Sequence, residues 1–126
     1  MSRLQRVLQA HRQAGRHSEA AIAAREAVAI LERLSILEPI DCYNLACGHA
    51  TLAGIGTMPG SGMSAVEGQA EAERAMQWLH RAVARGYRNV ALMQRDHDLD
   101  PLRGRDDFQL LMMDLAMPAD PFARTD

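Results

Sequence analysis

The chain contains no lysine: all 14 of its basic residues are arginine. A lysine Schiff base, the lysine of a phosphate-binding loop and the ATP-binding lysine of a protein kinase are therefore excluded from this chain. Aromatic residues are scarce as well, at 4%. Sheets favour aromatic and β-branched side chains, whereas the Ala, Leu and Met that are abundant here favour helices. The composition therefore predicts an all-α fold.

Cysteine and long apolar runs are also rare. Cys42 and Cys47 lie on one predicted helix, where the turn of roughly 140° between them makes their thiols diverge. We therefore expect no disulfide and a reducing, cytoplasmic compartment. The apolar runs are far shorter than the roughly 18 residues that a membrane span needs, and the net charge of −2 does not favour nucleic acid. We expect neither a membrane nor a nucleic-acid partner.

A helix–turn–helix pattern occurs twice in the chain. The first copy extends from Leu4 to Val28, and the second extends from Tyr43 to Gly54 and resumes at Ala75 to Val83 after a longer connection. The matched positions are Leu4/Tyr43, Val7/Ala46, Leu8/Cys47, His11/Ala50, Gly15/Gly54, Ala20/Ala75, Ala24/Leu79, Ala27/Ala82 and Val28/Val83. A repeat of this kind buries its apolar face only against a neighbouring copy. The pattern therefore favours a stacking, partner-binding protein over an enzyme.

The length of 126 residues is that of one domain. Apolar spacing, caps and breakers predict helices over Ser2–Ala14, Ser18–Leu37, Asp41–Gly54, Gln69–Arg85, Val90–Arg95 and Arg105–Ala116. Asp41 and Asn89 are expected to cap the third and fifth of these helices, and Gly86 to end the fourth. The Gly- and Pro-rich stretch Ile55–Gly68 is predicted to be a mobile loop, and Asp100–Pro101 to be an N-cap followed by the first residue of a helix. Residues 1–117 are thus expected to form one domain, with helix pairs at 1–38 and 41–86, a capping segment at 89–117 and a tail at 118–126.

The spacing of small residues resembles the tetratricopeptide repeat. Gly15, Ala20 and Ala27 recur as Gly54, Ala75 and Ala82, at positions where the paired helices of that repeat touch. Residues 41–117 resemble more specifically the tetratricopeptide "end-of-group" module, through Tyr43 to Cys47, Ala82 to Tyr87, Asp98 to Arg103, Phe108, Leu110 and Leu111. The resemblance implies two antiparallel helix pairs, the second with a long insertion between its helices, closed by C-terminal capping helices.

In that family the module often closes the C-terminal arm of large bacterial serine/threonine protein kinases, notably those of planctomycetes. The resemblance therefore implies a non-catalytic interaction, scaffold or capping module, or alternatively the C-terminal regulatory fragment of such a kinase. The chain has no glycine-rich phosphate loop, no His-Arg-Asp catalytic loop and no Asp-Phe-Gly motif. His11 and His17 stand where the repeat usually has aromatic residues. We expect no catalysis by this chain and no cofactor.

Two groups of residues carry the side-chain chemistry of metal ligands. Asp96, Asp98, Asp100 and Asp107 have the spacing of a calcium loop, but Pro101 replaces its glycine and Arg103 repels a cation, so we expect these aspartates to cap helix starts. Cys42, Cys47, His49 and His80 are zinc- or thiol-type residues without CxxC or HxxxH spacing. We expect no bound metal. A small metal- or thiol-dependent enzyme is the distant alternative.

The first helix of each pair lines the concave side of a stacked repeat. The residues expected to face away from the packing stripe on these helices are Gln5, Gln9, Arg12, Asn44, Gly48 and Thr51. They are the candidate partner-binding positions, because such a surface can hydrogen-bond an extended peptide; a merely solvated face is the other interpretation. The N-terminal repeat edge has no cap of its own, so self-association through the first two predicted helices is expected as well.

Overall fold

Every element in the described part of the chain is a helix. The computed structural model describes residues 17–34, 37–58 and 61–117. It contains α2 (His17–Glu32), α3 (Pro39–Ile55), α4 (Ala65–Ala84), α5 (Val90–Arg95), the 3₁₀-helix η1 (His97–Leu102) and α6 (Asp106–Ala116). The all-α prediction is confirmed for these residues. The predicted helix Ser2–Ala14 and the tail Pro118–Asp126 lie outside the described residues.

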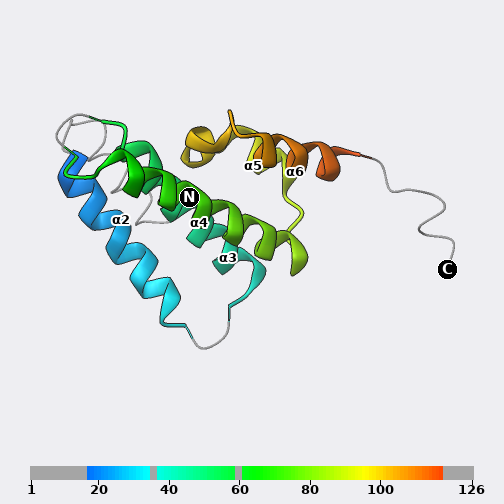
Figure 1. Ribbon diagram of the computed structural model, residues 1–126. Coiled ribbons are helices and arrows are strands. Elements are labelled where there is room, and N and C mark those ends of the chain that lie inside the picture. The colour runs from blue at the N-terminus through cyan, green and yellow to red at the C-terminus, as the bar shows by residue number, and fades with distance from the viewer. Residues whose placement is uncertain (1–16, 35–36, 59–60, 118–126) are drawn as a thin grey trace, which may run out of the picture.

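Helix α3 lies at the centre of the molecule. Helices α2, α3 and α4 run in alternating directions, while α5, η1 and α6 lie on a different side of the α3–α4 pair from α2 (Figure 1). α3 packs mainly against α4, then α2, then η1. Its sequence, PIDCYNLACGHATLAGI, has no polar face, because side chains on nearly all sides of the helix are buried against its neighbours.

The apolar core has two parts. The larger cluster joins α3 and α4 to the C-terminal segment and includes Tyr43, Met76, Leu79, Leu102 and Phe108. The smaller cluster lies between α2 and the end of α3, and its members are Ala20, Ala21, Ala24, Leu52 and Ile55. The C-terminal segment is thus part of the main core and is not an appendage to it.

Small residues set the distance between α2 and α3. Ala20 and Ala24 are fully buried, and Ala27 is nearly so. On the facing helix, a Cβ atom added to Gly48 would come within 2.7 Å of Cγ2 of Val28. Ala75 and Ala82 of α4 are also fully buried. The predicted alanine stripes therefore do lie at helix contacts.

The boundaries around α3 differ from those predicted. Helix α2 ends at Glu32 and not at Leu37, and α3 begins at Pro39 with Glu38 as its N-cap. Proline is favoured at the first helical position because its fixed φ suits a helix and its missing N–H has no partner there. Asp41, predicted as the cap, lies inside the helix, where its carboxylate accepts a hydrogen bond from the Glu38 N–H at 2.8 Å.

The connection between α3 and α4 is shorter than the predicted loop Ile55–Gly68. Ile55 is the last residue of α3 and is buried, whereas α4 begins at Ala65 and includes Gly68. The reason is a capping box: Ser64 Oγ accepts from the Glu67 N–H, and the Glu67 carboxylate accepts from the Ser64 N–H, each at 3.1 Å. These reciprocal bonds start the helix four residues before Gln69.

The turns after α4 follow the predictions more closely. Gly86 has a φ of +107°, and the hydrogen bonds from Gly86 N to Val83 O and from Tyr87 N to Ala82 O close α4 as a Schellman motif. Asn89 caps α5 as expected, through Leu92 N. Asp100–Pro101 does not start a helix, because both residues lie within η1 and Asp96 is its N-cap. Helix α6 begins at Asp106, one residue later than predicted.

Candidate functional site

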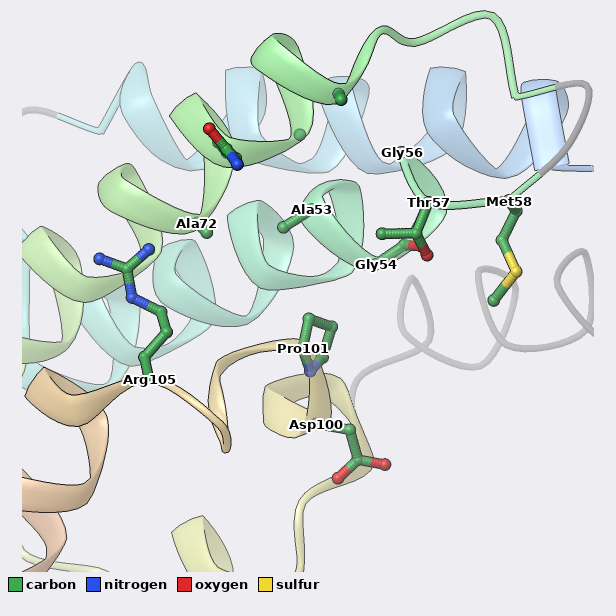
Figure 2. Close-up of a pocket in the computed structure, with 12 residues that line it drawn as sticks. Ala53, Gly54, Gly56, Thr57, Met58, Ala72, Asp100, Pro101 and Arg105 are labelled. Carbon is green, nitrogen blue, oxygen red and sulfur yellow. The ribbon is translucent and has the colours of Figure 1, made fainter.

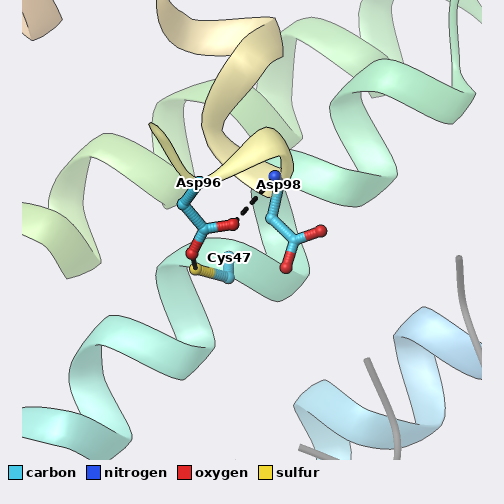
Figure 3. A group of neighbouring side chains, drawn as sticks. All are labelled: Cys47, Asp96 and Asp98. Carbon is cyan, nitrogen blue, oxygen red and sulfur yellow. Dashed lines mark hydrogen bonds between the residues drawn. The ribbon is translucent and has the colours of Figure 1, made fainter. Parts of the chain in front are cut away.

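A polar cluster lies where η1 crosses α3. The Tyr43 hydroxyl donates to Oδ2 of Asp96 at 2.6 Å, and the Cys47 thiol lies 3.8 Å from the same oxygen. The other Asp96 oxygen, Oδ1, accepts from the Asp98 N–H at 3.0 Å and so caps η1. Figure 3 shows the Cys47, Asp96 and Asp98 side chains converging from the two elements. Asp96 thereby joins the C-terminal segment to the central helix.

The surroundings of this cluster disfavour ionisation of its thiol and phenol groups. Burial, followed by the charges of Asp96 and Asp98, raises the pKa of the Cys47 thiol well above its usual value. Burial, followed by the influence of Cys47 and Asp96, raises the pKa of Tyr43 as well. Cys47 is therefore a neutral thiol in the core, which is the opposite of what a nucleophile needs.

Tyr87 extends the cluster through its ring. It stacks on Tyr43 with ring centroids 4.5 Å apart and an angle of 11° between the ring planes. Burial, followed by the charges of Cys47 and Asp96, raises the pKa of Tyr87 to about 12. That oxygen is buried and makes no hydrogen bond within the described part of the protein.

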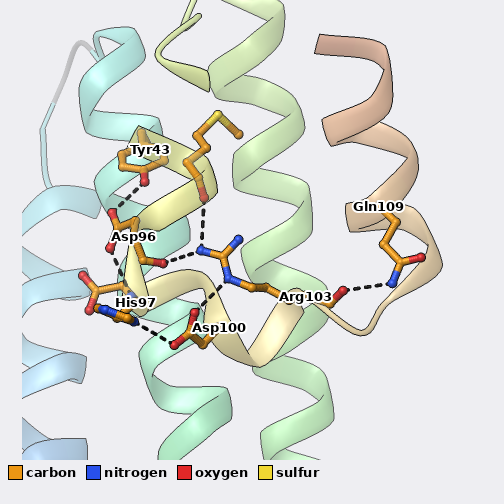
Figure 4. A network of polar contacts seen from close by, with 8 residues as sticks. Tyr43, Asp96, His97, Asp100, Arg103 and Gln109 are labelled. Carbon is orange, nitrogen blue, oxygen red and sulfur yellow. Dashed lines mark hydrogen bonds and ion pairs between the residues drawn. The ribbon is translucent and has the colours of Figure 1, made fainter. Parts of the chain in front are cut away.

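Arg103 ties η1 to its flanking helices (Figure 4). One guanidinium nitrogen donates to the carbonyl oxygens of Met93 and Asp96, at 3.2 and 2.8 Å, and Nε donates to Asp100 at 2.8 Å. Its own carbonyl accepts from the Gln109 amide of α6 at 3.0 Å. These contacts satisfy the carbonyl groups of a tight turn, which is a structural role for this arginine.

The four aspartates of the calcium-like spacing are not brought to one point. Asp96 and Asp98 face Cys47, but Asp100 pairs with Arg103 and with His97 Nδ1 at 3.1 Å. Asp107 pairs with Arg105 of the same turn, whose guanidinium also reaches Glu73 of α4 at 2.7 Å. The expected capping role is confirmed for Asp96.

The zinc-type residues of the sequence are separated in space. His49 contacts Glu71 of α4 at 3.4 Å, His80 is exposed on α4, and Cys42 is buried in the core. Among the described residues, the group with metal-ligand atoms within 4.8 Å of one another is Cys47, Asp96 and Asp98. Sequence reasoning missed this set because its members belong to two elements far apart in the chain.

His49 belongs to a second buried polar group, between α3 and α4. Its Nδ1 lies beside the Glu71 carboxylate, and Arg74, one turn further along α4, forms an ion pair with the same carboxylate. The other ring nitrogen, Nε2, is buried and has no hydrogen-bond partner in the described structure. The ion pair with Arg74 compensates the charge of the buried Glu71 carboxylate. The contact between His49 and Glu71 joins α3 to α4.

The predicted groove residues differ in their placement. Gln5, Gln9 and Arg12 lie outside the described residues. Asn44 is half-buried on α3. Gly48 faces Val28 of α2, and Thr51 is 1% exposed. The expectation that Gly48 and Thr51 line an open groove is therefore not met, because α3 is covered on that side too.

An open pocket of about 830 Å³ lies between the end of α3, the start of α4 and η1 (Figure 2). Its walls are mostly small residues, including Ala53, Gly54 and Ala72, and Pro101 approaches Gly54 so closely that a Cβ there would lie 2.8 Å from Cγ of the proline. Arg105 lines one end, but its charge is already paired with Asp107 and Glu73. The pocket thus offers shape and little unpaired charge.

Large apolar side chains are exposed on the two outermost helices. On α2, Ile22 is 55% and Ile30 is 51% exposed, on the side opposite the buried alanines. On α6, Leu110, Met113 and the following Met117 are each at least 60% exposed. We call these the α2 face (Ile22, Ile30) and the α6 face (Leu110, Met113, Met117). Among the described residues, both sets lie on the side of their helix that faces away from the core.

In the described part of the chain, no helix is both long enough and apolar enough to cross a membrane. Comparison of the chain with models of protein families, with curated proteins and with solved structures finds no match in any of the three.

Proposed function

We propose that this chain is a non-catalytic, tetratricopeptide-like interaction module that binds a protein partner or caps an array of helical repeats. The observation that carries the proposal is the α2 face. Ile22 and Ile30 lie about two turns apart on the exposed side of α2, with Glu26 between them, while Ala20, Ala24 and Val28 pack inward. A repeat helix exposes apolar side chains where the next unit of a stack is to dock.

The chemistry of the core supports binding over catalysis. Cys47 is buried and neutral, and the buried carboxylate of Glu71 is committed to an ion pair. The large pocket contains Arg105, whose charge is compensated within the fold. These groups stabilise helix contacts, and none of them presents an activated nucleophile or base to the pocket.

The experiment is capture of partners from the parent cell's extract, with the wild-type chain and two variants as bait. The double variant Ile22→Ser/Ile30→Ser removes the α2 face without touching the core. Leu110→Ser is the control, because Leu110 is 60% exposed on α6, which lies on a different side of the α3–α4 pair from α2. A protein retained by the wild type and the control, but lost by the double variant, supports the proposal. Equal retention by all three baits contradicts it.

The kinase-linked alternative concerns the context of the same module. The resemblance of residues 41–117 to the end-of-group module supports a place at the C-terminal arm of a bacterial serine/threonine kinase. In that case the α2 face would pack on preceding repeats of the same polypeptide. Co-purification of a kinase with the wild-type bait, lost with the Ile22→Ser/Ile30→Ser variant, distinguishes this alternative from an unrelated partner.

A further inference from the structure

We propose that Cys47, Asp96 and Asp98 form a binding site for a zinc-like divalent cation at the contact between α3 and η1. The ligand atoms come from two elements: the thiol sulfur from α3, one carboxylate from the residue that caps η1, and one from within η1. Each residue supplies one ligand atom, and all three atoms lie within 4.8 Å of one another. Cys47 and Asp98 are also deeply buried, at 1% and 6% exposure.

The spacing of these atoms suits one small ion. Around a tetrahedral Zn²⁺, with Zn–S near 2.3 Å and Zn–O near 2.0 Å, neighbouring ligand atoms lie roughly 3.5 Å apart. The Cys47 sulfur and Asp96 Oδ2 are 3.8 Å apart, which is close to that distance. The Asp98 ligand atom lies within 4.8 Å of the other two, and a change of carboxylate rotamer would close the remaining gap.

An independent observation comes from Tyr87. This residue is 9% exposed, and its buried hydroxyl oxygen has no hydrogen-bond partner in the described structure. Its ring stacks on that of Tyr43, whose own hydroxyl donates to Asp96. Buried polar oxygens are normally satisfied by a protein group, an ordered water or an ion. An ion held by Asp96, or a water bound to that ion, would give the Tyr87 hydroxyl such a partner.

The ligand set selects the class of metal. A thiolate disfavours Mg²⁺ and Ca²⁺, which take all-oxygen shells, and two carboxylates disfavour Cu(I). One sulfur with two or three oxygens fits a borderline ion such as Zn²⁺ or its spectroscopic substitute Co²⁺. The Tyr43 hydroxyl remains beside Asp96 and orients that carboxylate, as outer-shell donors do in metal sites.

Binding would proceed with loss of one proton. The Cys47 S–H bond breaks, the thiolate sulfur forms the bond to the metal, and the proton leaves to solvent, while Asp96 and Asp98 coordinate as carboxylates. Affinity should therefore fall as the pH is lowered, because protons compete for the ligands. The ion would clamp η1 onto α3, and with it the segment that carries Phe108 into the core.

The experiment is titration of the untagged, metal-free protein with Co²⁺, followed in the near-ultraviolet, with melting curves recorded in Zn²⁺ and in chelator. We expect a thiolate-to-cobalt charge-transfer band at one equivalent and a higher melting temperature with Zn²⁺. Cys42→Ser is the decisive variant, because it leaves Cys47 as the only thiol in the chain. The band should persist in Cys42→Ser. Asp98→Asn should weaken Zn²⁺ binding at least about tenfold, whereas the matched, exposed Asp100→Asn should not.

Each outcome bears on the site directly. Absence of the charge-transfer band together with an unchanged melting temperature in Zn²⁺ overturns the proposal. Loss of the band in Cys42→Ser assigns the metal to Cys42 and overturns it as well. Should Asp98→Asn fail to fold, the wild-type and Cys42→Ser spectra still decide whether Cys47 is a ligand.

Discussion

At the scale of single residues, Asp96 is a polar side chain that joins the C-terminal segment to the central helix. One of its oxygens caps η1, and the other accepts from Tyr43 of the central helix. A carboxylate that serves a local turn and a distant helix at once couples the formation of the two. Tyr43 and Tyr87 provide a matched test, because in the described structure the Tyr43 hydroxyl has a hydrogen-bond partner and the Tyr87 hydroxyl does not.

Replacing Tyr43 by Phe should lower the free energy of unfolding by about 1–3 kcal/mol, because a partly buried acceptor on Asp96 loses its charge-assisted donor. Tyr87→Phe removes a hydroxyl that makes no hydrogen bond in the described structure and should be neutral or slightly stabilising. Urea denaturation of both variants in chelator measures the difference. Equal destabilisation by the two changes would show that the Tyr43–Asp96 contact does not contribute as argued.

Gly48 lies where α3 packs closely against Val28 of α2. Gly48→Ala places a methyl group 2.7 Å from Cγ2 of Val28, a stiff β-branched side chain, and should cost roughly 1–3 kcal/mol despite the better helix propensity of alanine. Gly104→Ala is the control, since no atom lies within 4 Å of the added carbon. Thermal unfolding compares them. Adding Val28→Ala to Gly48→Ala should recover part of the loss if the clash is the cause.

At the scale of elements, the helices that sequence reasoning located well are those with local signals at their ends. Asn89 and Gly86 act within one turn, so α5 and the end of α4 were predictable from nearby residues. The start of α4 was missed although Ser64 and Glu67 form a capping box, because the glycines that precede them favoured a loop. The capping residues were a local signal for the helix start, but the glycine and proline content of the segment led to the loop prediction.

The polar cluster could not be predicted in the same way. Nothing in the sequence around Cys47 indicates that Asp96 lies beside it, since the contact depends on how η1 folds back over α3. The burial of α3 on all sides could not be predicted from its sequence either, because Thr51 is polar and Gly48 is small, as many surface residues are. Their burial is a consequence of α3 being covered by α2, α4 and η1 together.

Helix α6 offers a test of how firmly the C-terminal segment is joined to the core. Phe108 is 3% exposed and packs in the main cluster, so Phe108→Ala should cost roughly 3–5 kcal/mol. Leu110→Ala on the exposed side of the same helix should change stability by less than about 0.5 kcal/mol. Chemical denaturation gives both values. A Phe108→Ala variant as stable as the Leu110 variant would mean that α6 detaches without consequence for α3 and α4.

At the scale of the whole molecule, the arrangement of apolar surface is asymmetric about the central helix. Apart from Ile40 near its start, the large apolar side chains of α3 are buried, whereas the α2 face and the α6 face remain exposed on different sides of the α3–α4 pair (Figure 1). Surface of this kind favours association when no partner protein is present, because burying it removes apolar area from water. The sequence repeat predicts an open edge at the N-terminal side, formed by the helices expected over Ser2–Ala14 and Ser18–Leu37, and α2 is the one of these that the structure describes.

We therefore expect the isolated chain to self-associate in a concentration-dependent way through the α2 face, as measured by light scattering over a dilution series. Ile22→Ser/Ile30→Ser should shift the protein towards monomer, since each isoleucine loses the transfer free energy that drives association. Leu110→Ser/Met113→Ser removes comparable exposed apolar surface from the α6 face and should leave the association unchanged. A wild-type chain that stays monomeric at every concentration contradicts the open-edge argument. Dissociation by the α6 variant alone would instead move the interface to the C-terminal side, where the repeat pattern predicts a closed end.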